Sequence, residues 1–482
     1  MSRPDILVIM TDQQRWDALG CAGNPDIKTP HLDALAADGV YHAESFCPFP
    51  ICTPSRFSAL SGRYARQHFG SNNHSGLPPG VPTWPKALRS AGYRTACVGK
   101  MHFAPTYLDV GFDHMTLAEQ NGPGRDDDDY HRYLRERGLH DQVDLLDQVG
   151  EFRERAQADY WSSLGALESN LSEEHHSTTW IGDRCLDDIA AWGDHGNCLM
   201  AGFIKPHHPF DPPAPWSEMY DPDALSLVPG WTDAPLARDL AEHTGFFPHD
   251  QWDEAALRRC MALYYASISQ IDSQVGRIID ALKAAGRYDN TMIVFTADHG
   301  EYLGFHHLLL KNNHMYDPVM RVPLIIKYPE QTRRGEHDER LVTNLDLAPS
   351  ICACAGITWH RSPLSIDLTD TTQDRDCLFA ETDQGREYMV RTKQHKLLVT
   401  PENSFLFDLS TDPQEMTDCA AEASALRDQL RERLVRWSLF EATAPGHFDP
   451  DAALAPGSNV LGETGPHRDQ SQAYWREAMQ DL

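Results

Sequence analysis

The sequence predicts an α/β protein with a large, mixed and mostly parallel sheet flanked by helices, followed by a small antiparallel sheet. Three observations lead to this expectation. Short apolar runs alternate with segments of helical periodicity, these runs lack the alternation of a half-exposed strand, and the pattern changes after about residue 370. Strands buried on both faces have continuous apolar sequences, and the helices between them form the crossovers of a parallel sheet.

Five apolar runs are predicted to be buried strands, with four helices between them. The strands cover residues 6–10, 95–98, 199–204, 292–296 and 324–326. The helices cover residues 29–37, 83–91, 179–192 and 254–285. In the longest helix, apolar side chains recur every three or four residues from Leu257 to Leu282, and Gly286 is a C-terminal stop signal.

The C-terminal part of the chain has a different texture. Strand-like pieces at 378–381, 388–391, 396–399 and 405–407 precede a helical pattern at 420–437. They predict a small antiparallel sheet with one helix packed on it. We therefore divide the chain into an α/β domain (1–370), a small α+β subdomain (371–443) and an arm (444–482). The arm is rich in Pro, Gly and His, and we expect it to wrap a neighbouring subunit of a homo-oligomer.

The charge balance excludes several classes of partner. The chain has 42 Lys and Arg residues against 71 Asp and Glu residues, a formal net charge of −29. Repulsion of a polyanion argues against nucleic acid or an anionic membrane as a partner.

The sequence also predicts a cytoplasmic protein. No apolar run approaches the roughly 18 to 20 residues that span a bilayer, and no signal-peptide cleavage site follows the first residues. Eleven cysteines without regular spacing fit a reducing compartment.

Polar side chains directly follow four of the five predicted strands. They are Asp12 and Gln13; Lys100 and His102; Lys205, His207 and His208; and Asp298 and His299. In open α/β sheets, ligands bind beyond the carboxyl ends of the strands. One polar ending is usually a surface turn, but four together predict a single polar pocket.

Asp12, Gln13, Asp298 and His299 form a candidate cation site within this pocket. They offer two carboxylates, an amide oxygen and an imidazole, a set that suits Ca²⁺, Mg²⁺ or Mn²⁺ better than a thiolate zinc site. In the alternative interpretation, the aspartates cap helix N-termini and His299 packs in the core. One helix cap at each strand end would need only the two aspartates, and would not also need Gln13 and His299.

Cys52 lies at a predicted helix start. Thr53 can cap this helix, Pro54 suits its first turn, and Gly62 can end it. Free amides and the helix dipole favour an anion there, and Arg56 adds donors for oxyanion oxygens. The alternative is that Cys52 is a buried structural cysteine. Such a cysteine is expected among apolar neighbours, whereas Cys52 is followed by Thr53 and Pro54.

The segment Cys52-Thr-Pro-Ser-Arg56, followed by Leu60-Ser-Gly-Arg63, resembles the signature of the type I sulfatases of the alkaline phosphatase superfamily. Further motifs occur in the family's order: Gly99-Lys-Met-His102, Lys205-Pro-His-His-Pro-Phe210, Thr296-Ala-Asp-His-Gly300, and Lys311 ahead of Arg321-Val-Pro-Leu324. The resemblance covers nearly the whole chain. It implies the alkaline phosphatase/sulfatase fold.

The resemblance also implies the cofactors. Asp12, Gln13, Asp298 and His299 would hold one divalent cation together with the residue-52 oxygen, with Ca²⁺ or Mn²⁺ expected and Mg²⁺ as a further candidate. Cys52 would be oxidised after translation to a formylglycine, whose hydrated aldehyde is the nucleophile. A separate formylglycine-generating or anaerobic maturation enzyme would therefore be a partner.

The catalytic residues follow from the same resemblance. Arg56 and Lys100 would steady the nucleophile and the sulfate, and His102 would take a proton from the hydrated aldehyde. His207, rather than the histidine after it, would act with Lys311 on the sulfate and the leaving oxygen. In such a reaction, the metal ion and the cationic side chains would neutralise the negative charge of the sulfate oxygens.

We therefore expect a sulfatase that hydrolyses a small aryl or alkyl sulfate monoester. Many sulfatases carry an aspartate in place of Gln13 and an asparagine in place of His299, and the residues found here resemble choline sulfatases and phosphonate monoester hydrolases. A phosphonate monoester or phosphodiester hydrolase with the same machinery is therefore one alternative. A non-catalytic protein that binds sulfated ligands is an alternative of another class.

Overall fold

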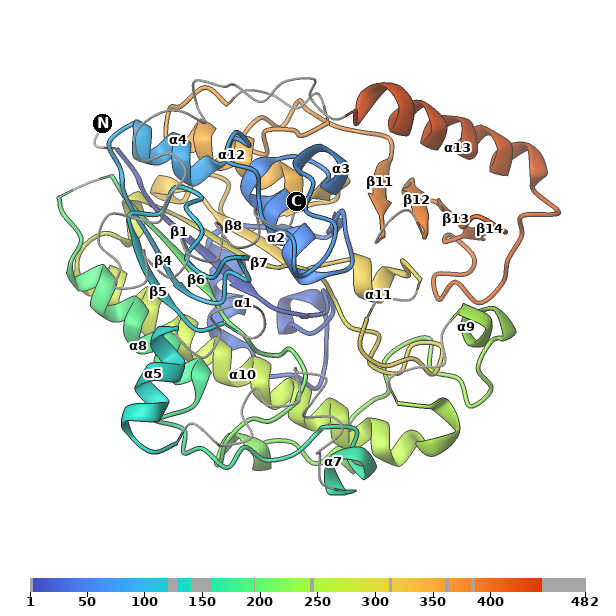
Figure 1. Ribbon diagram of the computed structural model, residues 1–482, viewed down its shortest axis with the longest axis horizontal. Coiled ribbons are helices and arrows are strands. Elements are labelled where there is room, and N and C mark those ends of the chain that lie inside the picture. The colour runs from blue at the N-terminus through green and yellow to red at the C-terminus, as the bar shows by residue number, and fades with distance from the viewer. Residues whose placement is uncertain are drawn as a thin grey trace, which may run out of the picture.

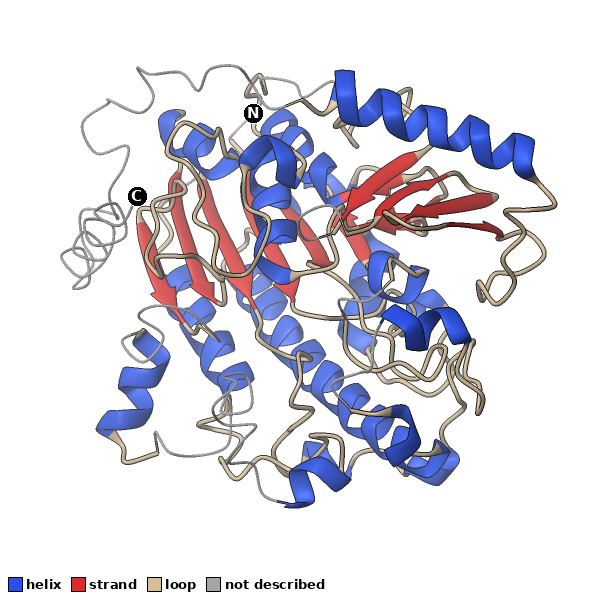
Figure 2. Cartoon of the chain, turned by 45° about the vertical axis from the view of Figure 1, so that its right-hand side comes forward, coloured by secondary structure: helices blue, strands red, loops and turns tan. Residues whose placement is uncertain are grey.

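The computed structural model describes residues 3–119, 128–139, 158–194, 196–242, 247–311, 314–359, 364–382 and 386–443. A twisted sheet lies at the centre with helices on both faces, and a smaller sheet lies beside it under a long helix (Figures 1 and 2). The expected fold class is confirmed. The arm at 444–482 lies outside the described residues, and the domain boundary at 370 stays a prediction.

The large sheet has eight strands in the order β5-β4-β6-β1-β7-β8-β2-β9. β5, β4, β6, β1 and β7 run parallel, whereas β8 is antiparallel to β7 and to β2, so the sheet is mixed as expected. The strands are β1 (Asp5–Thr11), β2 (Val40–His42), β4 (Arg94–Gly99), β5 (His114–Leu117), β6 (Asn197–Gly202), β7 (Thr291–Ala297), β8 (Leu324–Lys327) and β9 (Glu336–Asp338).

The strand register brings the polar strand ends level with one another. β1 lies between β6 and β7, and Thr11 pairs with Ala297, so the residues that follow these two strands emerge side by side. On the other flank Gly99 of β4 pairs with Gly202 of β6. The four strands that carry predicted site residues are thus consecutive in the sheet.

Helices cover both faces of the large sheet and bury its apolar side chains. One face packs against α1 (Pro30–Asp38), α8 (Ser177–Ala190) and α10 (Glu254–Ala284). The other packs against α2 (Cys52–Ser61), α4 (Trp84–Ser90) and α12 (Leu347–Cys354) (Figure 1). Further helices are α3 (Ala65–His68), α5 (Asp129–Glu136), α7 (Ala158–Ser162), α9 (Ala237–Glu242) and α11 (Asp317–Met320). Within the described ranges, no helix combines the length and apolar character needed to cross a membrane.

The small sheet is an antiparallel meander of four strands: β11 (Leu378–Glu381), β12 (Tyr388–Arg391), β13 (His395–Val399) and β14 (Ser404–Asp408). Helix α13 (Ser424–Arg436) packs on it, and its side chains share an apolar core with Val390, Leu397 and Leu406. A two-stranded parallel sheet, β3 (Ser45–Phe46) with β10 (Val342–Thr343), lies elsewhere in the chain. The expected antiparallel sheet with one helix is confirmed.

A buried ion-pair cluster joins the small sheet to the large domain. Lys396 of β13 is fully buried and pairs with Asp317 of α11 and with Glu415, whose Oε2 lies 2.9 Å from Lys396 Nζ. Arg391 Nη2 lies 2.9 Å from Asp317 Oδ2. Burial alone would raise the pKa of the Asp317 carboxyl, but Arg391 and Lys396 hold that pKa well below its usual range. The cluster therefore contains a carboxylate that is strongly stabilised in the folded state.

Asp317→Asn is expected to lower the unfolding free energy at pH 7 by about 3 to 5 kcal/mol, because it leaves two buried cations without their shared partner. The folded pKa of Asp317 lies below the unfolded value of about 4, so its contribution is complete above that value and is lost as the pH falls. Urea unfolding of the wild-type and Asp317→Asn proteins should therefore show a difference in unfolding free energy that narrows below about pH 4. Asp280→Asn, at an exposed position, is the control. A difference in unfolding free energy that is as large below about pH 4 as at pH 7 would contradict this explanation.

Candidate active site

The predicted site residues meet at the carboxyl edge of β4, β6, β1 and β7. Helix α2 begins at Cys52 beside the end of β7, where Ser55 Oγ donates to the Asp298 carbonyl oxygen at 2.5 Å. Asn344 Nδ2 donates to the Ala297 carbonyl oxygen at 3.1 Å and fixes the same strand end from the other side. The start of α2 is thereby held against the end of β7.

Four ligand atoms converge around Cys52. One each from Asp12, Cys52, Asp298 and His299 lie within 4.8 Å of one another, and all four residues are fully buried. Cys52 Sγ lies 3.5 Å from Asp12 Oδ1 and 3.3 Å from His299 Nε2. The structure therefore brings three of the four predicted cation ligands, Asp12, Asp298 and His299, together with the predicted nucleophile position.

His299 has the tautomer that a metal ligand requires. Its Nδ1 lies 2.9 Å from the Gly300 carbonyl oxygen, so Nδ1 carries the proton and Nε2 faces the cluster as an acceptor. Burial lowers the pKa of the His299 imidazole to about 4. Its Nε2 lies 3.8 Å from both Asp12 Oδ1 and Asp298 Oδ1. Acceptor atoms that converge in this way fit a divalent cation, for which carboxylate oxygens and a neutral imidazole are suitable ligands.

The interpretation of the two aspartates as helix caps is wrong. No helix begins directly after β1 or β7; the next elements in the described chain start at Gly20 and Asp317. Asp298 Oδ1 instead accepts from the main-chain N–H groups of Gln13, at 3.0 Å, and His299, at 2.9 Å. These bonds tie the two strand ends to each other.

Two buried cations balance the carboxylates. Arg56 places Nε 2.9 Å from Asp298 Oδ2 and Nη2 3.0 Å from Asp12 Oδ2. Lys100 Nζ lies 2.7 Å from the same Asp12 oxygen. Burial would raise the pKa of Asp12, but Lys100, together with the neighbouring His207, Lys311 and Arg56, holds it well below its usual range. Burial, assisted by the charge of Asp12, raises the pKa of Asp298 to about 6. Arg56 therefore contacts the carboxylates rather than standing free for an anion.

Lys311 and His207 form a pair on the open side of the site. Lys311 Nζ lies 2.7 Å from His207 Nε2, 2.8 Å from Gln13 Oε1 and 3.3 Å from Cys52 Sγ. Burial, followed by the charge of Lys311, lowers the pKa of the His207 imidazole well below its usual value. A donor-only ammonium next to a neutral imidazole can deliver a proton to an oxygen placed between them.

His208 lies away from these groups. Its Nε2 is 2.9 Å from the Leu164 carbonyl oxygen, and its ring packs against the rings of Tyr160, Phe210 and Phe247. It therefore serves the packing of the neighbouring core. The preference for His207 over His208 agrees with this placement.

His102 is a buried histidine held in a turn after β4. Its main-chain N–H donates to Glu119 Oε2 at 2.8 Å, and its carbonyl oxygen accepts from Thr53 Oγ1 at 3.0 Å. Among the described residues, neither ring nitrogen has a hydrogen-bond partner. Burial, reinforced by Lys100, keeps the pKa of this imidazole well below its usual value, so the ring is neutral and able to accept a proton.

The family model described as Sulfatase matches residues 4–357, about three quarters of the chain. The chain belongs to the sulfatase family. An arylsulfatase of Clostridium perfringens is 29% identical over 94% of this chain and 97% of its own length. A choline-sulfatase of Rhizobium meliloti is 26% identical over 93% of each chain. These relatives confirm the expected sulfuric ester hydrolase class.

The fold also resembles that of a phosphonate monoester hydrolase whose structure has been solved. The crystal structure of the enzyme from Agrobacterium radiobacter superposes with a TM-score of 0.75 at 24% identity, and the match covers 90% of this chain and 95% of that one. At this identity the similarity shows the fold alone.

Three partners of the sulfatase site were not predicted from the sequence. Glu301 and Glu119 are buried carboxylates that bind Gln13 and the His102 turn, respectively. Asn73 Oδ1 accepts from the Thr53 N–H at 3.1 Å and caps α2, so the expectation that Thr53 is the cap is wrong. The Thr53 hydroxyl is already committed to the main chain after β4. The only sequence signal for Glu301 is its place three residues after Asp298.

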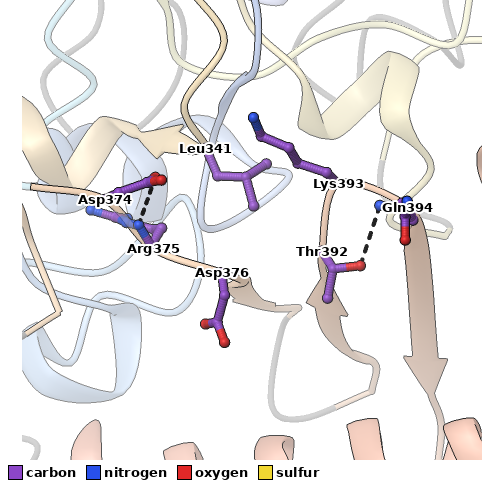
Figure 3. A pocket seen from close by; sticks show the side chains of 7 residues that line it. All are labelled: Leu341, Asp374, Arg375, Asp376, Thr392, Lys393 and Gln394. Carbon is purple, nitrogen blue, oxygen red and sulfur yellow. Dashed lines mark hydrogen bonds between the residues drawn. The ribbon is translucent and has the colours of Figure 1, made fainter.

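A separate cavity of about 620 Å³ lies where the small sheet meets the large domain (Figure 3). Its lining residues are Leu341, Asp374, Arg375, Asp376, Thr392, Lys393 and Gln394. Arg375 pairs with Asp346 at 2.5 Å, and Asp376 pairs with Arg433 at 2.5 Å. None of the predicted catalytic residues lines this cavity, so it is distinct from the sulfatase site.

Proposed function

We propose that this protein hydrolyses a small aryl or alkyl sulfate monoester, with residue 52 acting as a formylglycine. The position of Cys52 carries the proposal: its Sγ lies 3.3 to 3.5 Å from Asp12 Oδ1, His299 Nε2 and Lys311 Nζ. The residue-52 side chain thus stands between the candidate cation ligands and the Lys311–His207 pair. A nucleophile there would reach a sulfur atom whose oxygens contact the cation and Lys311.

The chain supplies the charge and proton transfers that this reaction needs. A divalent cation held by Asp12, Gln13, Asp298 and His299 would neutralise sulfate oxygens and acidify the residue-52 hydroxyl. The hydrated aldehyde offers one hydroxyl to attack sulfur and a second whose deprotonation restores the aldehyde and releases sulfate. His102, neutral and without a ring partner in the described chain, would take that second proton.

Lys311 and His207, rather than His102, would act on the leaving group. As the bond between sulfur and the leaving oxygen breaks, Lys311 or His207 would give that oxygen a proton. Lys311 Nζ lies 2.7 Å from His207 Nε2, so a proton can pass between these two side chains. The net reaction consumes one water and yields an alcohol or phenol and sulfate. Lys100 and Arg56 hold Asp12 in place during these steps through contacts of 2.7 and 3.0 Å.

A phosphonate monoester or phosphodiester hydrolase is the second candidate. Gln13 and His299 support this candidate, because these residue types at these two positions resemble the phosphonate monoester hydrolases. They resemble the choline sulfatases equally, so they do not separate the two candidates. A cytoplasmic location, assembly through the arm at 444–482 and dependence on a maturation enzyme are part of the same proposal.

Paired rates on 4-nitrophenyl sulfate and a 4-nitrophenyl phosphonate ester test the proposal. We expect the wild-type protein, made with a formylglycine-generating enzyme, to have the larger kcat/KM on the sulfate. A larger kcat/KM on the phosphonate would favour the second candidate. Binding of the aryl sulfate without turnover of either ester would instead support a non-catalytic sulfate-ester-binding protein.

A further inference from the structure

Glu301 is a buried carboxylate behind the candidate cation site. It is fully buried, and its Oε1 accepts from the main-chain N–H groups of Leu303, at 3.0 Å, and Leu310, at 2.5 Å. Its Oε2 accepts from the side-chain Nε2 of Gln13 in a short hydrogen bond. One oxygen of Glu301 is therefore fixed by two main-chain donors, and the other is aimed at Gln13.

Gln13 is held from both sides. Its Nε2 donates to Glu301, and its Oε1 accepts from Lys311 Nζ at 2.8 Å. A carboxylate only accepts hydrogen bonds and an ammonium only donates them, so the two partners allow a single orientation of the amide. In that orientation the oxygen of Gln13, and not its nitrogen, points toward Lys311 Nζ, which itself lies 3.3 Å from Cys52 Sγ and 4.0 Å from Asp12 Oδ1.

We propose that Glu301 is a positioning residue that fixes the Gln13 amide so that its Oε1 faces the cation. This inference rests on the cation site of the proposed function. An amide rotated by half a turn would present N–H donors to the cation and to Lys311, which removes one ligand and adds repulsion. Because this alternative rotamer has the same shape, packing alone cannot exclude it, and the hydrogen-bond partner must.

Glu301→Gln tests this directly, because it keeps the size of the side chain. The introduced glutamine has to turn its oxygen toward the Leu303 and Leu310 N–H groups, so its NH₂ group faces Gln13. Two NH₂ groups then oppose each other, and the Gln13 amide rotates to relieve the conflict. We expect the affinity for Mn²⁺ to fall by about 10- to 100-fold.

Adding Gln13→Glu should restore the affinity. The introduced glutamate accepts from the NH₂ group of the introduced glutamine with one oxygen and offers the other to the cation. In the wild-type background the same change sets two carboxylates against each other. We therefore expect the gain in Mn²⁺ affinity from Gln13→Glu to be about tenfold larger in the Glu301→Gln background than in the wild type, a non-additivity typical of directly contacting residues.

The experiment uses full-length, metal-free protein made with the maturation enzyme, titrated with Mn²⁺ by calorimetry, with thermal unfolding of each metal-free variant as a check of folding. Asp272→Asn is the matched control, because Asp272 is a buried carboxylate that likewise accepts from two main-chain N–H groups, those of His31 and Leu32, where α10 packs against α1. It should leave the Mn²⁺ affinity within about twofold of wild type. If Glu301→Gln alone does not fold, a double variant that folds and binds Mn²⁺ supports the inference.

Unchanged Mn²⁺ affinity in Glu301→Gln, or an equal effect of Gln13→Glu in both backgrounds, would overturn the positioning role while leaving the proposed function intact. A wild-type protein that binds no Mn²⁺ would overturn the cation site itself. The two failures are therefore distinguishable by the wild-type titration alone.

Discussion

Cys52→Ser is expected to change a turnover enzyme into one that reacts only once. A serine hydroxyl at residue 52 can attack the sulfate ester, but it has no second hydroxyl whose deprotonation would release sulfate. Loss of a covalent turnover route of this kind lowers kcat by about 10⁴-fold or more. Steady-state assays with 4-nitrophenyl sulfate should show this loss, and intact mass should show a population that carries one added SO₃ group.

Cys185→Ser is the matched control for this substitution. Cys185 is also fully buried, and it lies in α8, on the opposite face of the large sheet from α2. This variant should keep near-normal turnover and gain no SO₃ group. Sustained turnover by the Cys52→Ser protein would contradict the account, because it would mean that residue 52 is not the group that carries the sulfate.

Asp12→Asn is expected to have the second largest effect. Asp12 is fully buried, and its Oδ2 contacts both Lys100 and Arg56. The substitution removes a cation ligand and the buried negative charge that Lys100 and Arg56 both contact, so we expect loss of Mn²⁺ binding together with a decrease of about 3 to 5 kcal/mol in unfolding free energy at pH 7. The folded pKa of Asp12 lies below its unfolded value of about 4, so the stability difference should narrow as the pH falls below that value.

The control for Asp12→Asn lies at the other end of the same strand. Asp5 begins β1, and its carboxylate contacts Arg287 and Asn197, each at 2.8 to 2.9 Å. Asp5→Asn should lower the unfolding free energy without changing Mn²⁺ binding. Metal-free urea unfolding and a Mn²⁺ titration separate the two effects. If the Asp12→Asn protein kept the Mn²⁺ affinity of the wild type, the assignment of Asp12 as a cation ligand would be wrong.

Much of the fold could be predicted from the sequence because the central strands are apolar throughout. All five predicted strands occur, and α10 extends over 254–284 as its periodicity indicates. The large-sheet strands β2, β5 and β9 were not predicted, because each has only three or four residues, and β5 and β9 are in addition partly exposed and lack an apolar run. Helix α12 was also not predicted, since only its packing against α2 and α4 distinguishes it from an apolar loop.

The site was predictable where one short segment carries the chemistry and not where distant segments meet. The polar strand ends and Cys52 are visible as local patterns. Gln13 and Glu301 are 288 residues apart, and their hydrogen bond exists only because β1 and β7 are neighbours. The contacts of Arg56 were also beyond local reasoning: a buried guanidinium needs carboxylates around it, and those come from two separate strands.

The most direct test of the account is the mass of the residue-52 peptide, measured alongside turnover in protein made with and without a formylglycine-generating enzyme. We expect Cys52 alone among the eleven cysteines to be converted to formylglycine, and kcat to rise in proportion to the converted fraction. Full turnover by protein that retains an unmodified Cys52 would contradict the account's central claim.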